Sequence, residues 1–168
     1  MIKKTLFTIF FLLLLMANSH SAEGGDSGSS ESGASKIRTD YDKAVSHIKL
    51  AKKYEKKDKI KKANKRYQKA LELLIKSNEK KPNNPDTLNY LGFTTRKLGD
   101  FVNGEKFYLE GLAIEPNHIG INEYLGELYV ATNRIDLAKE RLNILKSCNC
   151  EEYIELSKII KGTKKSKY

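Results

Sequence analysis

The chain has 168 residues, with 31 lysines and arginines against 21 acidic residues and a formal net charge of +10 at pH 7. That length allows one domain with a modest core, and the basic balance favours an acidic partner or an anionic surface. Because no nucleic-acid-reading motif accompanies the basic residues, we expect no nucleic-acid partner, and no apolar stretch is long enough for a stable membrane span.

Residues 1–22 have the composition of a secretory signal peptide. A pair of lysines near the start precedes an apolar run over residues 6–16, and small residues follow the run. This order is typical of an exported chain, and the run is shorter than the roughly 20 residues that a membrane-spanning helix needs. We therefore expect cleavage near Ser21 or Ala22 and a periplasmic or secreted mature protein.

The remaining chain divides by composition. Residues 23–38 are a flexible Gly/Ser-rich linker because they offer little to bury, residues 39–162 form the predicted domain, and residues 163–168 are a basic tail. Residues 36–81 carry 17 lysines and arginines against six acidic residues. An acidic partner at this N-terminal hairpin is one interpretation, and a solvated helix face is the other.

An internal repeat organises the predicted domain. An offset of 34 residues relates residues 85–118 to residues 119–150, and an offset of 41 relates the middle unit to residues 44–84. The matching positions of the second and third units are Leu91 with Leu125, Gly92 with Gly126, Phe101 with Ile135 and Tyr108 with Leu142. The seven extra residues of the first unit make about two helical turns, so its second helix should be longer. Repetition at this period predicts an all-α array.

Each unit reads as two amphipathic helices joined by a tight turn. Residues 39–42 fit a capping box that starts the first helix. Asn84 and Pro85 suit the cap and first residue of the third helix, and Gly99 suits its end. The fourth helix should stop before Pro116. Glycine inside a helix costs up to about 1 kcal/mol against alanine, so the repeated helical glycines predict places where helix backbones come close.

The middle unit carries the most specific pattern, which consists of Leu88, Leu91-Gly92, Leu98-Gly99-Asp100-Phe101, Tyr108, Gly111-Leu112 and Pro116. This pattern resembles the tetratricopeptide repeat (TPR). The resemblance implies a right-handed superhelix of about three helix-turn-helix units, with a capping helix at residues 151–162. The chain also resembles small exported TPR proteins of Gram-negative bacteria that carry a cysteine pair before a final Glu-Glu-Tyr helix.

The resemblance further implies a concave face, lined by the first helix of each unit, that binds a peptide or a protein surface. The residues expected to bind a partner there are Ile48, Lys52, Asn89, Phe93, Arg96, Lys97, Glu123, Glu127 and Val130, with Lys56 on the same face. Phe93 is either an interface anchor or a packing residue between repeats. A clamp for a peptide's C-terminal carboxylate is not expected, because Glu123 and Glu127 would repel it.

Cys148 and Cys150 are separated by one residue. We expect them to form a structural disulfide, as in an oxidising compartment, or to pack as two thiols. The alternative is a Cu(I)-handling or thiol-redox protein that uses this pair. Two sulfurs alone are a weak metal signal, so we expect neither a metal site nor a cofactor.

No enzymatic motif stands out. The chain has no phosphate-binding loop, no HExxH helix and no nucleophile elbow, so we expect no catalytic residues and no enzymatic activity. The interpretation that remains is a non-catalytic module for protein–protein interaction in the periplasm. A self-associating structural protein is a further hypothesis, and the sequence leaves the partner and the oligomeric state open.

Overall fold

The structure, a computed structural model, describes residues 38–166. The described chain is helical, without strands, and its helices in order are α1 (Asp40–Glu55), α2 (Ile60–Lys80), α3 (Pro85–Lys97), α4 (Phe101–Ile114), α5 (Ile119–Ala131), α6 (Ile135–Leu145) and α7 (Glu151–Ile160). The signal peptide expected at residues 1–22 and nearly all of the linker expected at residues 23–38 lie outside the described residues. Among the described helices, none combines the length and the apolar character that crossing a bilayer requires.

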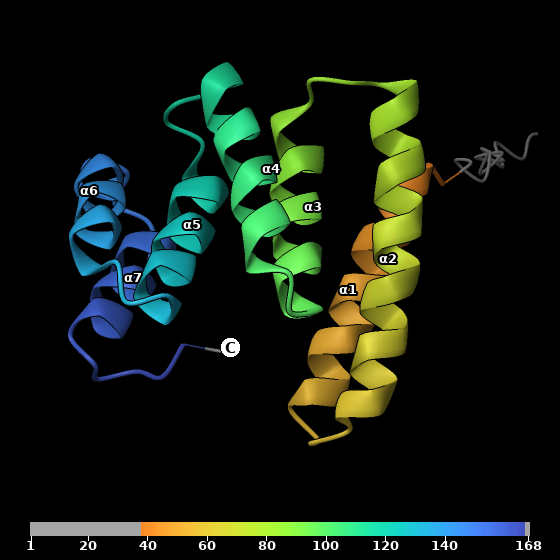
Figure 1. The fold of residues 1–168 in the computed structure, drawn as a ribbon, viewed down its shortest axis with the longest axis horizontal. Helices are drawn as coiled ribbons and strands as arrows, with labels where there is room; N and C mark the ends of the chain where they lie inside the picture. Colours follow the sequence, from red (N-terminus) through yellow and green to blue (C-terminus); the bar gives the residue numbers. More distant parts are fainter. Residues whose placement is uncertain (1–37, 167–168) are drawn as a thin grey trace, which may run out of the picture. The chain divides into compact units, whose positions relative to one another are not determined.

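The helices pair as successive hairpins (Figure 1). Helix α1 packs against α2, α3 against α4 and α5 against α6, while α2 contacts α3 and α4 contacts α5 between neighbouring hairpins. Helix α7 packs on α5 and α6. Helix α2 has 21 residues and α4 has 14, so the longer second helix predicted for the first unit is confirmed. The prediction of an all-α array of helical hairpins is likewise confirmed.

Local sequence sets the helix ends. The Thr39 hydroxyl accepts a hydrogen bond from the Asp42 N–H at 3.1 Å, and the Asp42 carboxylate accepts one from the Thr39 N–H at 2.9 Å, which confirms the predicted capping box. The Asn84 side chain accepts a hydrogen bond from the Thr87 N–H at 2.8 Å and caps α3. Gly99 ends α3 with φ of +97°, a conformation in which a side chain would be strained.

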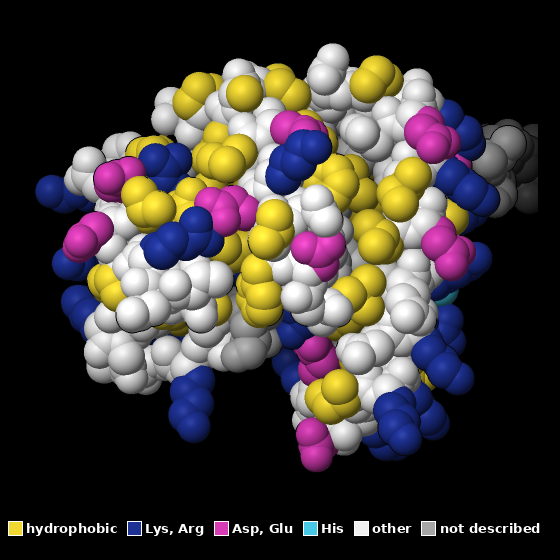
Figure 2. All heavy atoms as spheres, viewed as in Figure 1, with side chains coloured by type: hydrophobic (Ala, Val, Ile, Leu, Met, Phe, Trp, Pro, Cys, Tyr) yellow, Lys and Arg dark blue, Asp and Glu magenta, His cyan; other side chains and the backbone are white. Residues whose placement is uncertain are grey.

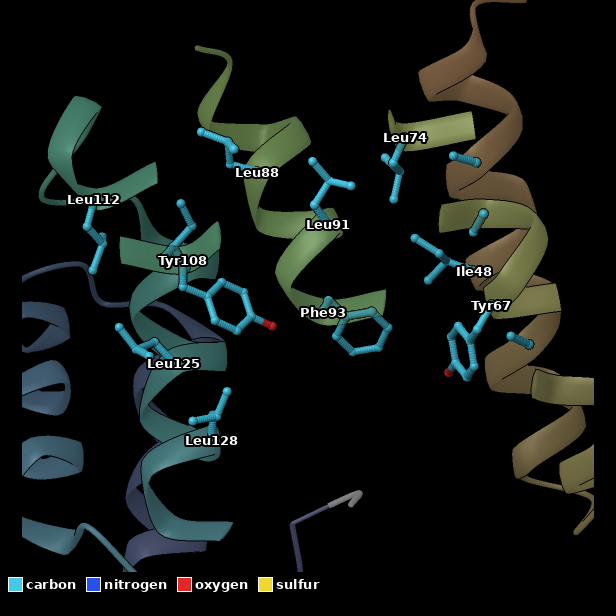
Figure 3. Close-up of a cluster of buried hydrophobic side chains, with 14 of the residues drawn as sticks. Ile48, Tyr67, Leu74, Leu88, Leu91, Phe93, Tyr108, Leu112, Leu125 and Leu128 are labelled. Carbon is cyan, nitrogen blue, oxygen red and sulfur yellow. The ribbon is translucent and has the colours of Figure 1, made fainter. Parts of the chain in front are cut away.

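The buried side chains form one hydrophobic cluster that passes through all three hairpins (Figure 3). Its larger members include Ile48, Tyr67, Leu74, Leu88, Leu91, Phe93, Tyr108, Leu112, Leu125 and Leu128. Figure 3 shows Leu88 and Leu91 of α3 between Leu74 of α2 and Tyr108 of α4. Burying such a side chain contributes about 1.5–3 kcal/mol, so each hairpin is stabilised by the apolar face of its neighbours.

The helical glycines make room mainly for side chains rather than for backbones. A Cβ atom at Gly92 would lie 2.6 Å from ring atoms of Tyr108, and one at Gly126 would lie 2.5 Å from a methyl group of Leu156. The expectation of a close backbone approach holds between Gly92 and Gly104, since a Cβ at Gly104 would lie 3.1 Å from the carbonyl oxygen of Gly92. At Gly126 the prediction was wrong about which atoms approach, because α7 inserts the Leu156 side chain there.

Replacing Gly92 by alanine should destabilise the chain. Overpacking costs about 1–3 kcal/mol and the gain in helix propensity is at most about 1 kcal/mol, so we expect a net loss of about 1–2 kcal/mol in the free energy of unfolding. Urea denaturation followed by circular dichroism measures this loss. The loss should shrink in Gly92→Ala/Tyr108→Leu, which lacks the ring, whereas a Gly92→Ala chain more stable than the wild type would contradict this packing.

Candidate binding groove

A hollow with a volume of about 480 Å³, which we call the groove, lies where the first helices of the three hairpins meet the α1–α2 turn. Its lining residues are Lys52, Glu55, Lys56, Ile60, Phe93, Lys97, Glu123, Tyr124 and Glu127. Helices α1, α3 and α5 each contribute, so the groove runs across successive hairpins. A site of this kind is formed only when the hairpins stack.

Aromatic rings form the floor of the groove. The ring of Phe93 lies with its centroid 5.0 Å from that of Tyr124 and 5.9 Å from that of Tyr67, and Figure 3 shows Phe93 of α3 facing Tyr67 of α2. Phe93 is only 3% exposed, so it anchors α3 to both neighbouring hairpins and offers little area to a partner. Of the two roles expected for Phe93, packing between repeats is the one that its burial favours.

Lys52 lies over this aromatic floor. Its ammonium group lies 4.5 Å from the centroid of the Phe93 ring and donates a hydrogen bond to the Tyr124 hydroxyl at 3.3 Å. The contact with the negative face of the ring is favourable by about 0.5–2 kcal/mol, depending on how far the charge is desolvated. The half-buried Lys52 thus adds a positive charge to an otherwise aromatic surface.

A buried ion pair lies beneath the groove. The Arg96 guanidinium donates a hydrogen bond to the Glu127 carboxylate at 3.0 Å and another to the Tyr124 carbonyl oxygen at 2.6 Å. The side chains of Arg96 and Glu127 are 0% and 5% exposed. A charge buried this deeply is tolerated only when it is paired and hydrogen-bonded, so this contact fixes α3 against α5.

A second ion pair closes the groove on the side of the first hairpin. The Lys97 ammonium lies 2.6 Å from a carboxylate oxygen of Glu55, and the other oxygen of Glu55 accepts a hydrogen bond from the Tyr67 hydroxyl at 2.9 Å. Burial, followed by the neighbouring Glu55 charge, raises the pKa of Tyr67 far above its usual value, which keeps the phenol protonated as the donor. This network joins α1, α2 and α3.

Glu123 has the most perturbed carboxyl group of the groove. Burial, and then the nearby carboxylates of Glu127 and Glu152, raise its pKa from 4.5 to about 7. Within residues 38–166, no ion pair is formed by Glu123. The charges of Lys52 and Arg96 oppose this rise, so Glu123 lies near cationic groups of the groove as well as near carboxylates.

The structure places five of the nine predicted partner-binding residues in the groove, and these are Lys52, Phe93, Lys97, Glu123 and Glu127. Lys56, expected on the same face, also lines it. The expectation that the first helix of each unit lines the binding face therefore located the groove. The binding role of these residues stays a prediction.

The other four residues lie elsewhere, which corrects their expected placement. Ile48 is 2% exposed within the core, and Val130 packs against that core. Asn89 is buried where α3 meets Gly120 at the start of α5. Arg96 is directed toward the groove as predicted, but its side chain is buried and paired with the carboxylate of Glu127. Helical register predicts the direction of a side chain, whereas its depth depends on the neighbouring hairpin.

Three groove residues were missed by the sequence reasoning. Tyr124 lies between the predicted Glu123 and Glu127 and turns its ring onto Phe93. Glu55 and Ile60 flank the α1–α2 turn, which lines the groove.

The two cysteines form a disulfide, Cys148–Cys150, in the turn before α7. Binding of Cu(I) would require these two sulfur atoms as thiolates, whereas a thiol-redox role would use both the disulfide and its reduced form. Across residues 38–166, no group of three or more histidine, cysteine or acidic side chains is arranged to hold a metal ion. The covalent bridge instead links the two residues that flank Asn149, whose φ is +49°.

Basic side chains gather on the surface of α1 and α2 (Figure 2). Residues 38–81 carry 16 lysines and arginines against six acidic residues. Several of these charges are already compensated, as in the ion pairs of Lys80 with Asp40 and of Lys69 with Glu72. An acidic partner for this hairpin stays a prediction.

The raised pKa of Glu123 should appear in the pH dependence of stability. The folded chain holds this proton more tightly than the unfolded chain, so stability should fall as the pH rises from about 4.5 to about 7, by roughly 3 kcal/mol in total. In Glu123→Gln this component of the pH dependence should vanish. Urea denaturation of both chains from pH 4 to pH 8 measures the difference, and parallel pH profiles would contradict the assignment.

Comparison with known proteins finds structures of similar fold but no match at the level of sequence. No protein-family model matches the sequence, and no curated protein matches it. The fold is similar to a structure described as the first TPR of Spaghetti (RPAP3) bound to the HSP90 peptide SRMEEVD, with a TM-score of 0.51 and 22% identity over 76% of this chain and 98% of that one. It is also similar to the first TPR domain of human RPAP3, with a TM-score of 0.54 and 20% identity over 74% of this chain and 94% of that one.

These likenesses agree with the repeat pattern and with the stacked hairpins. The described chain therefore has the fold of a tetratricopeptide repeat domain.

Proposed function

We propose that the chain is a non-catalytic protein–protein interaction module that binds an extended peptide segment in the groove. The observation that carries this proposal is the groove itself, a hollow of about 480 Å³ built jointly by three hairpins. A peptide was bound in the structure of the Spaghetti TPR domain, which supports a peptide as the class of ligand for this fold. The fold alone does not name the partner.

The chemistry of the groove favours a segment with an aromatic or aliphatic side chain. Tyr124 and the half-exposed Ile60 offer apolar surface beside the Phe93 ring. The ammonium groups of Lys52 and Lys56 suit an acidic or carbonyl group of the segment, and Glu123 suits a cation. Because the floor is held by buried ion pairs, little ordering of the groove is needed on binding, which favours affinity.

We further propose that this module acts in the periplasm or outside the cell. The basic, apolar and small-residue order of residues 1–22 supports export, and the disulfide between Cys148 and Cys150 suits an oxidising compartment. Resemblance to exported TPR proteins of Gram-negative bacteria points the same way.

Charge reversal in the groove should abolish capture of the partner. The variant Lys52→Glu/Ile60→Asp changes two lining residues, neither of which is fully buried. The matched control Lys65→Glu/Val102→Asp makes the same changes at exposed positions that do not line the groove. Both chains, checked for folding by circular dichroism, are used with the wild type to capture proteins from periplasmic extract, with quantitation by mass spectrometry.

We expect the groove variant to lose its specific partner at least about tenfold, since central interface residues cost 2 kcal/mol or more when disrupted. The control should capture as much as the wild type. Equal recovery by all three chains would overturn the groove assignment.

Export is tested separately. Expression of the full chain in a Gram-negative host, followed by fractionation and N-terminal sequencing, should give a periplasmic chain that begins just after Ser21 or Ala22. An intact N-terminus in the cytoplasmic fraction would contradict the export proposal and would leave the groove proposal standing.

A further inference from the structure

The first hairpin forms one end of the helical stack. Among residues 38–166, the backbones of α1 and α2 approach only each other and that of α3. Figure 2 shows lysine and arginine side chains gathered over this hairpin. Of the 16 cationic residues between positions 38 and 81, 14 are lysines. Polar groups of either charge would keep such an end solvated, so the excess of one sign points to a negatively charged partner.

Five of these cations follow one side of α2. They are separated by three, four or seven residues, and such spacings return to the same side of a helix. The five residues, which we call the basic row, are Lys62, Arg66, Lys69, Lys76 and Lys80. All except the half-buried Arg66 are exposed. From the first residue to the last, the row is about 27 Å long.

The basic row adjoins α1, where it creates a positive potential. The ring of His47 on α1 lies 3.5 Å from the Arg66 guanidinium. Burial lowers the pKa of this histidine, and three neighbouring cations lower it further, these being Arg66, Lys69 and Arg38. A position that disfavours one more positive charge favours an anion instead.

Acidic side chains neutralise the basic row only in part. Lys69 pairs with Glu72, and Lys80 pairs with Asp40. Exposed ion pairs of this kind are weak. Within residues 38–166, Lys62 and Lys76 form no ion pair. The row therefore keeps a net positive charge.

A hollow of about 540 Å³, which we call the basic pocket, lies where α2 ends and where α1 and α3 begin. The cations that line it are Arg38, Lys43, Lys80 and Lys81, with hydroxyl groups from Thr39, Tyr41, Ser77 and Thr87 and carboxylates from Asp40 and Asp86. The pKa of Asp40 is lowered first by a hydrogen bond from Lys80 and then by the charges of Lys43 and Lys76. Lysines of the row and of the pocket thus surround one carboxylate. Ammonium and hydroxyl groups are also the donors that a phosphate group accepts.

We propose that the basic row and the basic pocket dock the chain on an anionic phospholipid surface, with a lipid phosphate in the pocket. A cluster of roughly four to eight cations on one helix is typical of anionic-lipid binding. Interfaces between proteins are enriched in arginine and depleted in lysine, whereas the flexible point charge of lysine suits phosphates without a fixed arrangement. The row also extends well beyond the pocket, which alone would hold a small anion.

This docking surface is separate from the groove. None of the residues of the basic row or the basic pocket lines the groove. Lipid docking and peptide binding therefore use different residues, and either proposal can fail without the other.

Vesicle flotation tests the lipid proposal. The vesicles contain either phosphatidylcholine alone or phosphatidylcholine mixed with phosphatidylglycerol. The chains are the wild type, the row variant Lys62→Glu/Lys76→Glu and the control Lys106→Glu/Lys165→Glu, which makes the same change in net charge at exposed lysines outside the row. Because the chains differ only at these positions, residues 1–22 contribute equally to all three. Circular dichroism checks that each chain is folded.

We expect the wild type and the control to prefer the vesicles with phosphatidylglycerol and to be released by high salt. Each lysine near an anionic surface strengthens binding about fivefold, so the row variant should bind at least about 30-fold more weakly. The milder variant Lys62→Gln/Lys76→Gln should lose about 30-fold and separates the loss of charge from any loss of folding. Absence of a preference for phosphatidylglycerol, or equal binding by the row variant and the control, would overturn the proposal.

An acidic polypeptide is the other class of partner that a basic surface can bind. Labelled poly-L-glutamate replaces the vesicles in a second titration, read by fluorescence anisotropy. Tighter binding to the vesicles than to polyglutamate, compared at equal concentrations of negative charge, supports lipid docking. Tighter binding to polyglutamate that is lost in Lys62→Glu/Lys76→Glu would mean that the basic row binds an acidic protein, and lipid docking would be wrong.

Discussion

The groove depends on one buried contact, the ion pair between Arg96 of α3 and Glu127 of α5. The guanidinium group also donates to the Tyr124 carbonyl oxygen, so a single side chain holds two consecutive turns of the third hairpin. The guanidinium carbon of Arg96 lies 5.7 Å from the centroid of the Phe93 ring and 5.3 Å from that of the Tyr124 ring. The floor of the groove is therefore formed by ion-paired and aromatic side chains rather than by aliphatic ones. Its shape is fixed before a ligand binds.

Small residues make this arrangement sterically accessible. Gly104 lets α4 approach α3 so closely that a Cβ there would lie 3.0 Å from the Cβ of Arg96. Gly92 leaves space for the Tyr108 ring, whose centroid lies 5.7 Å from the guanidinium carbon of Arg96. Packing inside the second hairpin thus sets the position of Arg96, and Arg96 in turn sets the distance between the second and third hairpins. The small residues of the second hairpin thus determine its packing, and that packing determines the geometry of the groove.

Much of the fold could be predicted from the sequence because the same pattern recurs in each unit. A helix boundary that is ambiguous in one unit can be assigned from the matching position in another. The capping box at Thr39, the cap at Asn84 and the left-handed Gly99 each have a local physical cause, and all were predicted correctly. The site was predicted less well. Arg96 was expected to face a partner, yet it is buried, because the partner that neutralises it is 31 residues away and no local pattern indicates that pairing.

The aromatic floor shows the same limit. Phe93 was identified by its helical position, but Tyr124 was not, since the choice between a core ring and a groove ring depends on how α5 is rotated against α3. Residues 163–168 were predicted only as a basic tail, whereas Lys164 pairs with Glu155 of α7. Long-range ion pairs are set by tertiary structure, so they become visible only once the hairpins are stacked.

The most direct measurement of this account is a double-mutant cycle on the buried ion pair. The free energies of unfolding of the wild type, Arg96→Met, Glu127→Met and the double variant give the coupling energy between the two side chains. Each single variant leaves a buried charge without its partner, so we expect each to be destabilised by about 3–5 kcal/mol and the double variant to recover much of that loss. A coupling energy of at least about 1 kcal/mol would support the account. Strictly additive losses would show that Arg96 and Glu127 do not hold the second and third hairpins together, and the preformed groove would lose its physical basis.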